Sequence, residues 1–121
     1  MLEKEFKEHS DRVIELLKVR EERKKELKEC AEELLELESS WRNESKDIIL
    51  NTDFKKLYGK DNEHIRNAHL DTEISDMTDK IEEQKSMVKF LKMDISQIDK
   101  EINVHNKILS FINIVNDNKN V

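Results

Sequence analysis

The chain has 121 residues, of which 41% are charged and 5% are aromatic, and it contains one Gly and no Pro. A compact globule with many turns draws heavily on Gly and Pro, so this composition excludes that class and favours long amphipathic helices. The net charge of -6 argues against attraction to nucleic acid or to anionic lipid. No run of about 18 apolar residues and no signal-like N-terminus is present, so we expect a cytoplasmic protein without membrane or direct nucleic-acid partners.

The first predicted element is one helix over about residues 2–50, because apolar residues recur there at alternating steps of three and four. Arg20 and Arg23 interrupt the apolar seam near its middle, which lowers local stability but can fix the register. Ser39 and Ser40 leave open a break, with a separate helix from Trp41 to Leu50. The continuous helix is favoured because Trp41 keeps the heptad phase across the serines.

The next segment, about residues 51–61, predicts a chain reversal with a short helical piece. Asp53 can cap a helical turn that ends at the left-handed Gly59, and Asp61 or Asn62 can cap the helix that follows. Residues 62–115 predict a second long helix with its own heptad seam, and residues 116–121 predict a frayed tail.

Together these elements predict an all-α fold, a single long antiparallel helical hairpin of the coiled-coil type. When the two heptads are aligned antiparallel so that Leu16 faces Ile95, the midpoint between paired residue numbers falls at Lys55 and Lys56. These residues lie inside the predicted turn. A register shifted by one heptad remains open. The predicted seam consists of Val13, Leu16, Leu27, Leu34, Leu37, Ile74, Met77, Ile81, Val88, Leu91, Ile95, Ile98, Ile102 and Leu109.

Apolar residues beside the seam widen the stripe on both helices: Leu17 and Ala31 on the first, Met87 and Ile108 on the second. A helix with a widened stripe usually contacts more than one neighbour. We therefore predict a homodimer that forms a four-helix assembly, with a monomeric hairpin as the competing interpretation.

The reactive residue types do not predict an enzyme. His64 and His69 are five residues apart, a spacing that turns the second ring away from a shared metal. His9 and His105 lie in the seam near one another and predict either a satisfied polar layer or a pH-sensitive weak point. Cys30 lies on the seam without a partner base, so it reads as a small core residue. We expect no catalytic residues, no metal site and no cofactor.

Basic residues cluster around Arg20 and Lys28, but Glu residues interleave with them almost one for one. This pattern is typical of a solvated face of salt bridges, and it carries no aromatic residues that could stack on bases. Direct nucleic-acid binding is therefore not predicted from this cluster.

Residues 59–68 carry the pattern Gly-Lys-x-Asn-Glu-x-x-Arg-x-Ala, in which Glu63 and Arg66 can pair along the helix. This run, about a tenth of the chain, resembles an element of small, poorly characterised helical proteins of phages and prophages. The resemblance implies a virus-encoded accessory factor that acts inside a host cell.

The predicted function is that of a non-enzymatic coiled-coil interaction or scaffold protein, which binds an unidentified host or viral protein through the residues around its turn. The alternative is an acidic accessory or inhibitor of a nucleic-acid-processing enzyme, which would bind a basic groove by charge complementarity. The residue types enriched at binding sites gather at this turn, and the candidate protein-binding residues are Trp41, Phe54, Leu57, Tyr58, Asn62, Glu63 and Arg66.

Overall fold

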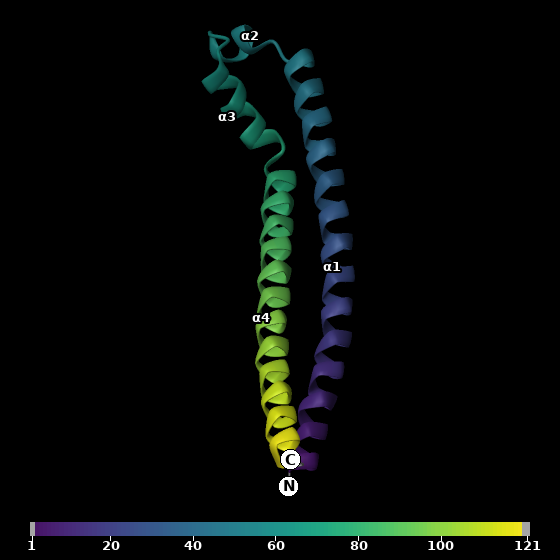
Figure 1. Ribbon diagram of the computed structural model, residues 1–121. Helices are drawn as coiled ribbons and strands as arrows, with labels where there is room; N and C mark the ends of the chain where they lie inside the picture. The colour runs from purple at the N-terminus through teal and green to yellow at the C-terminus, as the bar shows by residue number, and fades with distance from the viewer. Residues whose placement is uncertain (1, 120–121) are drawn as a thin grey trace. The chain divides into compact units, whose positions relative to one another are not determined.

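The computed structural model describes residues 2–119, and these residues form four helices and no strand. They are α1 (Leu2–Asn51), α2 (Phe54–Tyr58), α3 (Glu63–Glu73) and α4 (Ser75–Lys119) (Figure 1). The predicted all-α helical hairpin is confirmed, because α1 packs against α4. The chain divides into a terminal unit, residues 1–28 with 89–121, and a turn unit, residues 29–88.

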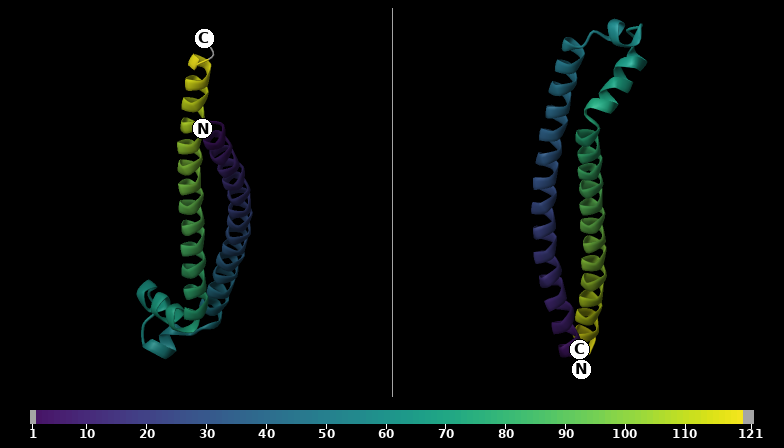
Figure 2. Two further views of the ribbon diagram at one scale, coloured as in Figure 1. Left: turned by 90° about the horizontal axis from the view of Figure 1, so that it is seen from below. Right: turned by 180° about the vertical axis from the view of Figure 1, so that it is seen from behind.

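The terminal unit is a pair of antiparallel helical segments around a thin apolar core. Leu16 of α1 is buried against Ile98 and Ile102 of α4, and Val13 and Val19 pack on this cluster. Figure 2 shows the two segments side by side in both views. Two helices bury only a narrow stripe, so each of these contacts supplies a large share of the stability of the unit.

The register of the terminal unit differs from the favoured one. The predicted register opposes Leu16 to Ile95, whereas Leu16 packs on Ile98 and Ile102, and His9 lies against His105. The contacts are therefore displaced toward the C-terminal end of α4, in the direction of the alternative register. A seam of similar aliphatic residues fits neighbouring registers almost equally well, so polar contacts decide between them.

Arg20 and Arg23, the two interruptions of the seam, turn aside and pair with acidic residues of α4. Arg20 donates from Nε to Asp99, and Arg23 donates from Nε to Asp94 over 2.9 Å. The hydrogen bond to Asp94, with Glu26 nearby, raises the pKa of the Arg23 guanidinium. These pairs give the terminal unit directional contacts that an apolar seam lacks.

The turn unit joins the remaining parts of α1 and α4 through α2 and α3. The Gln84 side chain of α4 donates to the carbonyl oxygen of Cys30, 3.0 Å away, and to the Glu33 carboxylate, 3.1 Å away. Leu70, Ile74 and Ile81 are buried in this unit. Cys30 is half-buried and free, as expected for a seam residue.

Helix boundaries agree with the prediction in α1 and differ in the second long helix. α1 runs through Ser39 and Ser40 without a break. The helix predicted over residues 62–115 is instead divided at Ile74, which caps α3 with φ -123° and ψ 30°. The Thr72 hydroxyl donates to the Ala68 carbonyl, a contact that commonly bends helices, just before this break.

The tail predicted to fray, residues 116–121, is helical as far as Lys119, and residues 120 and 121 lie outside the described part of the chain. None of the helices within residues 2–119 has the length and apolar character needed to cross a bilayer.

The structure buries or half-buries all of the predicted seam residues. Among them, the most enclosed are Leu16, Ile74, Ile81, Leu91, Ile98 and Ile102. The half-buried members are Val13, Leu27, Leu34, Leu37, Met77, Val88, Ile95 and Leu109.

Candidate functional site: the turn segment

The turn segment, residues 52–70, is fixed by three local devices. The Asp53 carboxylate accepts a hydrogen bond from the Lys56 backbone N–H at 3.1 Å and begins α2. Gly59 ends α2 with φ 76°, and its N–H donates to the Lys55 carbonyl. The Asn62 side chain accepts from the Ile65 N–H at 2.9 Å and begins α3. Each device satisfies backbone groups that a helix end leaves unpaired.

The left-handed conformation of Gly59 yields a first prediction. Gly59→Ala should lower the free energy of unfolding by about 1 to 2 kcal/mol, because a Cβ is disfavoured at positive φ. Apart from its two chain neighbours, no residue has an atom within 4 Å of the position that this Cβ would occupy, so the cost is conformational. Gly59→Asn should cost less, because Asn tolerates this conformation. Urea unfolding followed by circular dichroism measures both, and equal stability of wild type and Gly59→Ala would contradict the assignment.

An aromatic cluster holds α2 against α3. Phe54 is 3% exposed, and its ring packs edge-on against His69 with centroids 5.3 Å apart. The Tyr58 ring lies 5.7 Å from the His69 ring, and the Tyr58 hydroxyl is 2.6 Å from His69 Nδ1. Sequence reasoning weighed His69 as a metal ligand and missed this role, since the contact exists only once α3 folds back on α2.

Arg66 and Asp61 form the main ion pair of the segment. Arg66 Nε lies 3.3 Å from Asp61 Oδ1, at an angle outside hydrogen-bonding geometry. The predicted pairing of Arg66 with Glu63 is therefore wrong, because Asp61 lies nearer, just before the start of α3. Arg66 is half-buried, and Glu63 is exposed in the first turn of α3, where its charge favours the helix dipole.

The predicted binding residues differ in exposure and in position. Leu57, 62% exposed, and Tyr58, 49% exposed, present apolar surface to solvent, and Asn62 and Glu63 are also exposed. Phe54 is buried, so it supports the segment and cannot touch a partner. Trp41 is half-buried on α1 and lines a different pocket of about 470 Å³ beside Arg42 and Ile81. The structure therefore separates Trp41 from the other six candidates.

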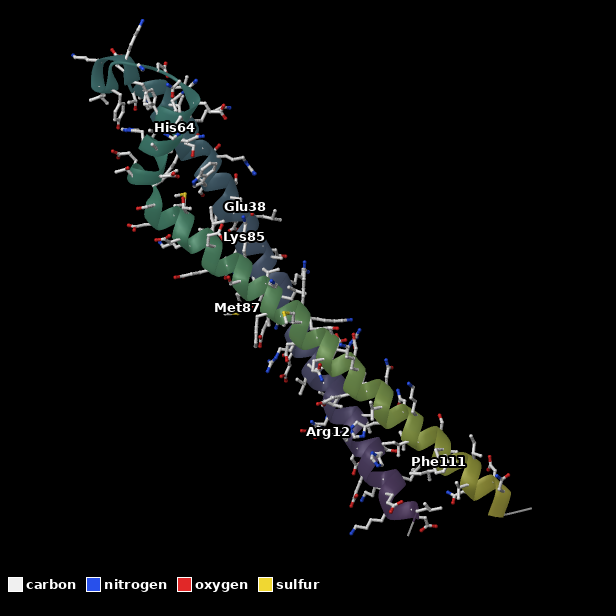
Figure 3. All side chains as sticks on the ribbon, turned by 90° about the vertical axis from the view of Figure 1, so that its left-hand side faces the viewer. Arg12, Glu38, His64, Lys85, Met87 and Phe111 are labelled. Carbon is white, nitrogen blue, oxygen red and sulfur yellow. The ribbon has the colours of Figure 1, made fainter. Side chains whose placement is uncertain are left out.

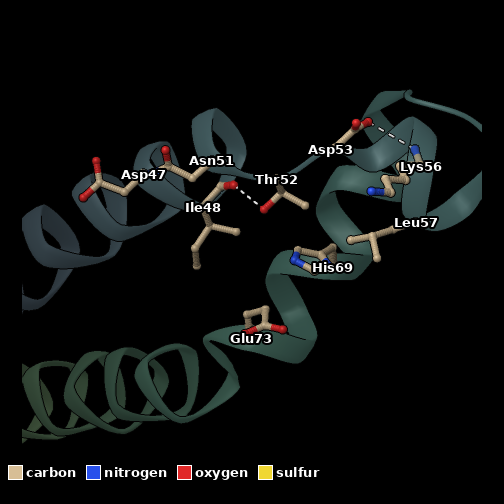
Figure 4. Close-up of a pocket in the computed structure, with 9 residues that line it drawn as sticks. All are labelled: Asp47, Ile48, Asn51, Thr52, Asp53, Lys56, Leu57, His69 and Glu73. Carbon is tan, nitrogen blue, oxygen red and sulfur yellow. Dashed lines mark hydrogen bonds between the residues drawn. The ribbon is translucent and has the colours of Figure 1, made fainter.

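A pocket of about 500 Å³ lies between the end of α1 and the turn segment (Figure 4). Three carboxylates line it, those of Asp47, Asp53 and Glu73, together with the cationic Lys56 and the His69 ring. Leu57 and Ile48 supply apolar lining. Acidic groups outnumber Lys56 by three to one, so the pocket favours a cationic group next to an apolar one.

The other histidine residues lie outside the turn pocket. His9 Nδ1 lies 2.8 Å from His105 Nδ1, so one ring donates and the other accepts in this layer. His64 is exposed on α3 (Figure 3). Within residues 2–119, no group of three or more His, Cys, Asp or Glu residues is arranged to hold a metal ion.

Sequence reasoning also missed a second apolar stripe on α4. Phe90, Met93, Val104, Phe111 and Ile114 are all more than half exposed. They lie at heptad positions opposite the seam. Their separations of 3, 11, 7 and 3 residues keep them in phase with a heptad and can be derived from the sequence, but the seam alone accounts for the helical pattern of α4.

Comparison of the chain with protein-family models, with curated proteins and with solved structures found no match. The functional argument therefore depends on the geometry of the turn segment and on the exposed faces of the helices.

Proposed function

We propose that this chain is a non-enzymatic interaction protein that self-associates as a homodimer and binds a protein partner through its turn segment. The observation that carries the proposal is the exposure of Leu57 and Tyr58 beside an acidic pocket, on a segment held by caps at both helices. Exposed apolar groups on a preorganised surface bind with little loss of conformational entropy. The resemblance of residues 59–68 supports a virus- or prophage-encoded accessory factor that acts inside the host cell.

The chemistry of the pocket defines the partner more closely. Asp47, Asp53 and Glu73 favour a Lys or Arg side chain, and Leu57 favours an apolar side chain next to it. A helix or loop that carries a basic residue within one turn of a large apolar residue would satisfy both. The partner is therefore a protein segment of mixed basic and apolar character.

The test replaces one exposed side chain that the fold does not need. Leu57→Asp should weaken partner binding about tenfold or more, because it removes the apolar contact and places a charge against the partner's apolar side chain. Leu35→Asp is the matched control, since Leu35 is 65% exposed on α1 and lies outside the turn segment. Affinity capture followed by calorimetry with the captured partner measures the effect, and equal affinity of both variants would contradict the proposal.

A second variant tests the same surface through different residues. Replacement of Tyr58 and Arg66 together with Ala should abolish capture while far-ultraviolet circular dichroism stays close to that of wild type. Retained capture would exclude the turn segment as the binding site.

The alternative function, an acidic inhibitor of a nucleic-acid-processing enzyme, makes a different prediction about salt. A purely electrostatic complex with a basic groove should weaken steeply between low and physiological ionic strength, because screening acts on its whole binding energy. Binding through Leu57 and the pocket should retain a salt-insensitive part. Titration of the captured partner at several salt concentrations separates the two.

A further inference from the structure

The terminal unit carries an apolar stripe that no other part of residues 2–119 covers. On α4 the positions 90, 93, 97, 100, 104, 107, 111 and 114 alternate steps of three and four, the spacing of a coiled-coil seam. The apolar members are exposed, from 55% at Val104 to 66% at Phe111. Phe111 is labelled in Figure 3, which views the protein from the side of α4. The stripe lies opposite the seam that packs on α1.

The corresponding face of α1 shows that this stripe is specific to α4. At the equivalent heptad positions between residues 4 and 28, α1 carries only charged residues: Lys4, Glu8, Asp11, Glu15, Lys18, Glu22 and Lys25. Solvated helix faces are normally of this kind. An apolar heptad on the outer face of α4 alone therefore indicates that α4 has a second helical neighbour.

We infer that this neighbour is α4 of a second copy, packed antiparallel about a twofold axis next to Ile102. In that arrangement Phe90 faces Ile114 of the partner subunit, and Met93 faces Phe111 of the partner subunit. Polar positions meet near the centre, where Gln97 faces Lys107 of the partner subunit. The stripe is apolar at both ends and mixed in the middle, so it is complementary to its own reverse, as an isologous interface requires.

The positions that flank the stripe agree with the same axis. Lys89 faces Asp117 of the partner subunit, which places opposite charges together at both ends. Asn103 faces Asn103 of the partner subunit at the axis, where two amides can exchange hydrogen bonds. On the other flank the two Glu101 residues approach each other, and Arg12 lies 3.6 Å from the Glu101 carboxylate within each copy and offsets its charge.

Other alignments of the same stripe are less favourable. A shift of one heptad in one direction places Phe111 against Lys100, and a shift in the other direction places Phe90 against Lys107. A parallel arrangement places Lys100 against Lys100 of the partner subunit and Lys107 against Lys107 of the partner subunit. Each shifted alignment opposes a Lys to a Phe, and the parallel arrangement opposes like charges. The pairing at Ile102 opposes Lys100 only to Val104 of the partner subunit and keeps Phe90 and Phe111 on apolar partners, so this pairing is selected.

This inference rests on the proposed self-association and specifies its geometry, so the experiment measures the two separately. Light scattering of the full chain gives the mass, expected at twice 14.5 kDa. Phe111→Glu should return the mass to that of a single chain, because it places a charge against Met93 of the partner subunit. Leu35→Glu, at an equally exposed position on α1, should leave the dimer intact.

Disulfide cross-linking of variants that also carry Cys30→Ser then tests the antiparallel pairing of the two α4 helices. Gln97→Cys and Lys107→Cys proteins of different mass are mixed in a glutathione redox buffer. The antiparallel pairing predicts cross-links between the two variants and few within either one. Two outcomes would overturn this geometry without contradicting self-association. One is cross-links of each variant to itself, and the other is a dimer that forms no cross-links at either position. A monomeric wild type would overturn both, while capture by the turn segment would still be tested on its own.

Discussion

Replacing Leu16 with Ala should lower the free energy of unfolding by about 2 to 5 kcal/mol, one of the two largest effects expected in this chain. Leu16 is 4% exposed and forms the α1 side of the cluster with Ile98 and Ile102. A two-helix core has no further layer that could collapse into the vacated volume. The lost contacts and the remaining cavity therefore both contribute to the cost.

The neighbouring residue supplies a matched control. Leu17→Ala makes the same chemical change one position along, where the side chain is 45% exposed, and should cost less than about 1 kcal/mol. Urea unfolding at one fixed protein concentration measures both variants, since association would otherwise shift the midpoint. Equal losses at Leu16 and Leu17 would contradict the position of the core.

Several features were predictable because their signals are local. The capping roles of Asp53, Gly59 and Asn62 follow from short-range backbone chemistry, and all three form as expected. The seam was predictable for a related reason, since a heptad fixes which face of a helix is apolar whatever its partner is. Hence the hairpin could be derived from the sequence with its turn in the correct place.

Other features depend on contacts that no local pattern encodes. The break at Ile74 occurs without Gly or Pro, at a residue that keeps the heptad phase. The contact of His69 with Phe54 and Tyr58 joins two helices across the turn. The register of the terminal unit follows from interhelical pairs such as Arg23 with Asp94. In each case tertiary geometry selects among options that the sequence leaves nearly equal.

The second stripe of α4 belongs to a different category, because its signal was in the sequence. Phe90, Met93, Val104, Phe111 and Ile114 repeat with the same period as the seam, and one helix can carry two such repeats when it has two neighbours. To recognise the stripe, one must know the exposure of each side chain. Exposure distinguishes apolar residues that face solvent from apolar residues that belong to the buried seam. The structure supplies that distinction.

Phe54→Ala should destabilise the turn segment by about 3 to 5 kcal/mol, the other large effect expected here. Phe54 is buried beneath Tyr58 and His69, and its loss removes the ring on which both pack. The amide protons of α2 and α3 should exchange with solvent faster by roughly two to three and a half orders of magnitude, since about 1.4 kcal/mol corresponds to a factor of ten. Amides near Leu16, in the other unit, should keep their protection.

The control for this variant is Leu57→Ala, which removes a side chain of similar size from the exposed face of α2. Its amide exchange should remain close to that of wild type, although binding of a partner should weaken. Phe54→Ala should lose both its protection from amide exchange and its binding of the partner. A surface that is not held in place loses conformational entropy when it becomes ordered on binding, which weakens the complex. Retained binding by Phe54→Ala, with fast exchange in α2, would mean that the partner does not require the folded turn segment.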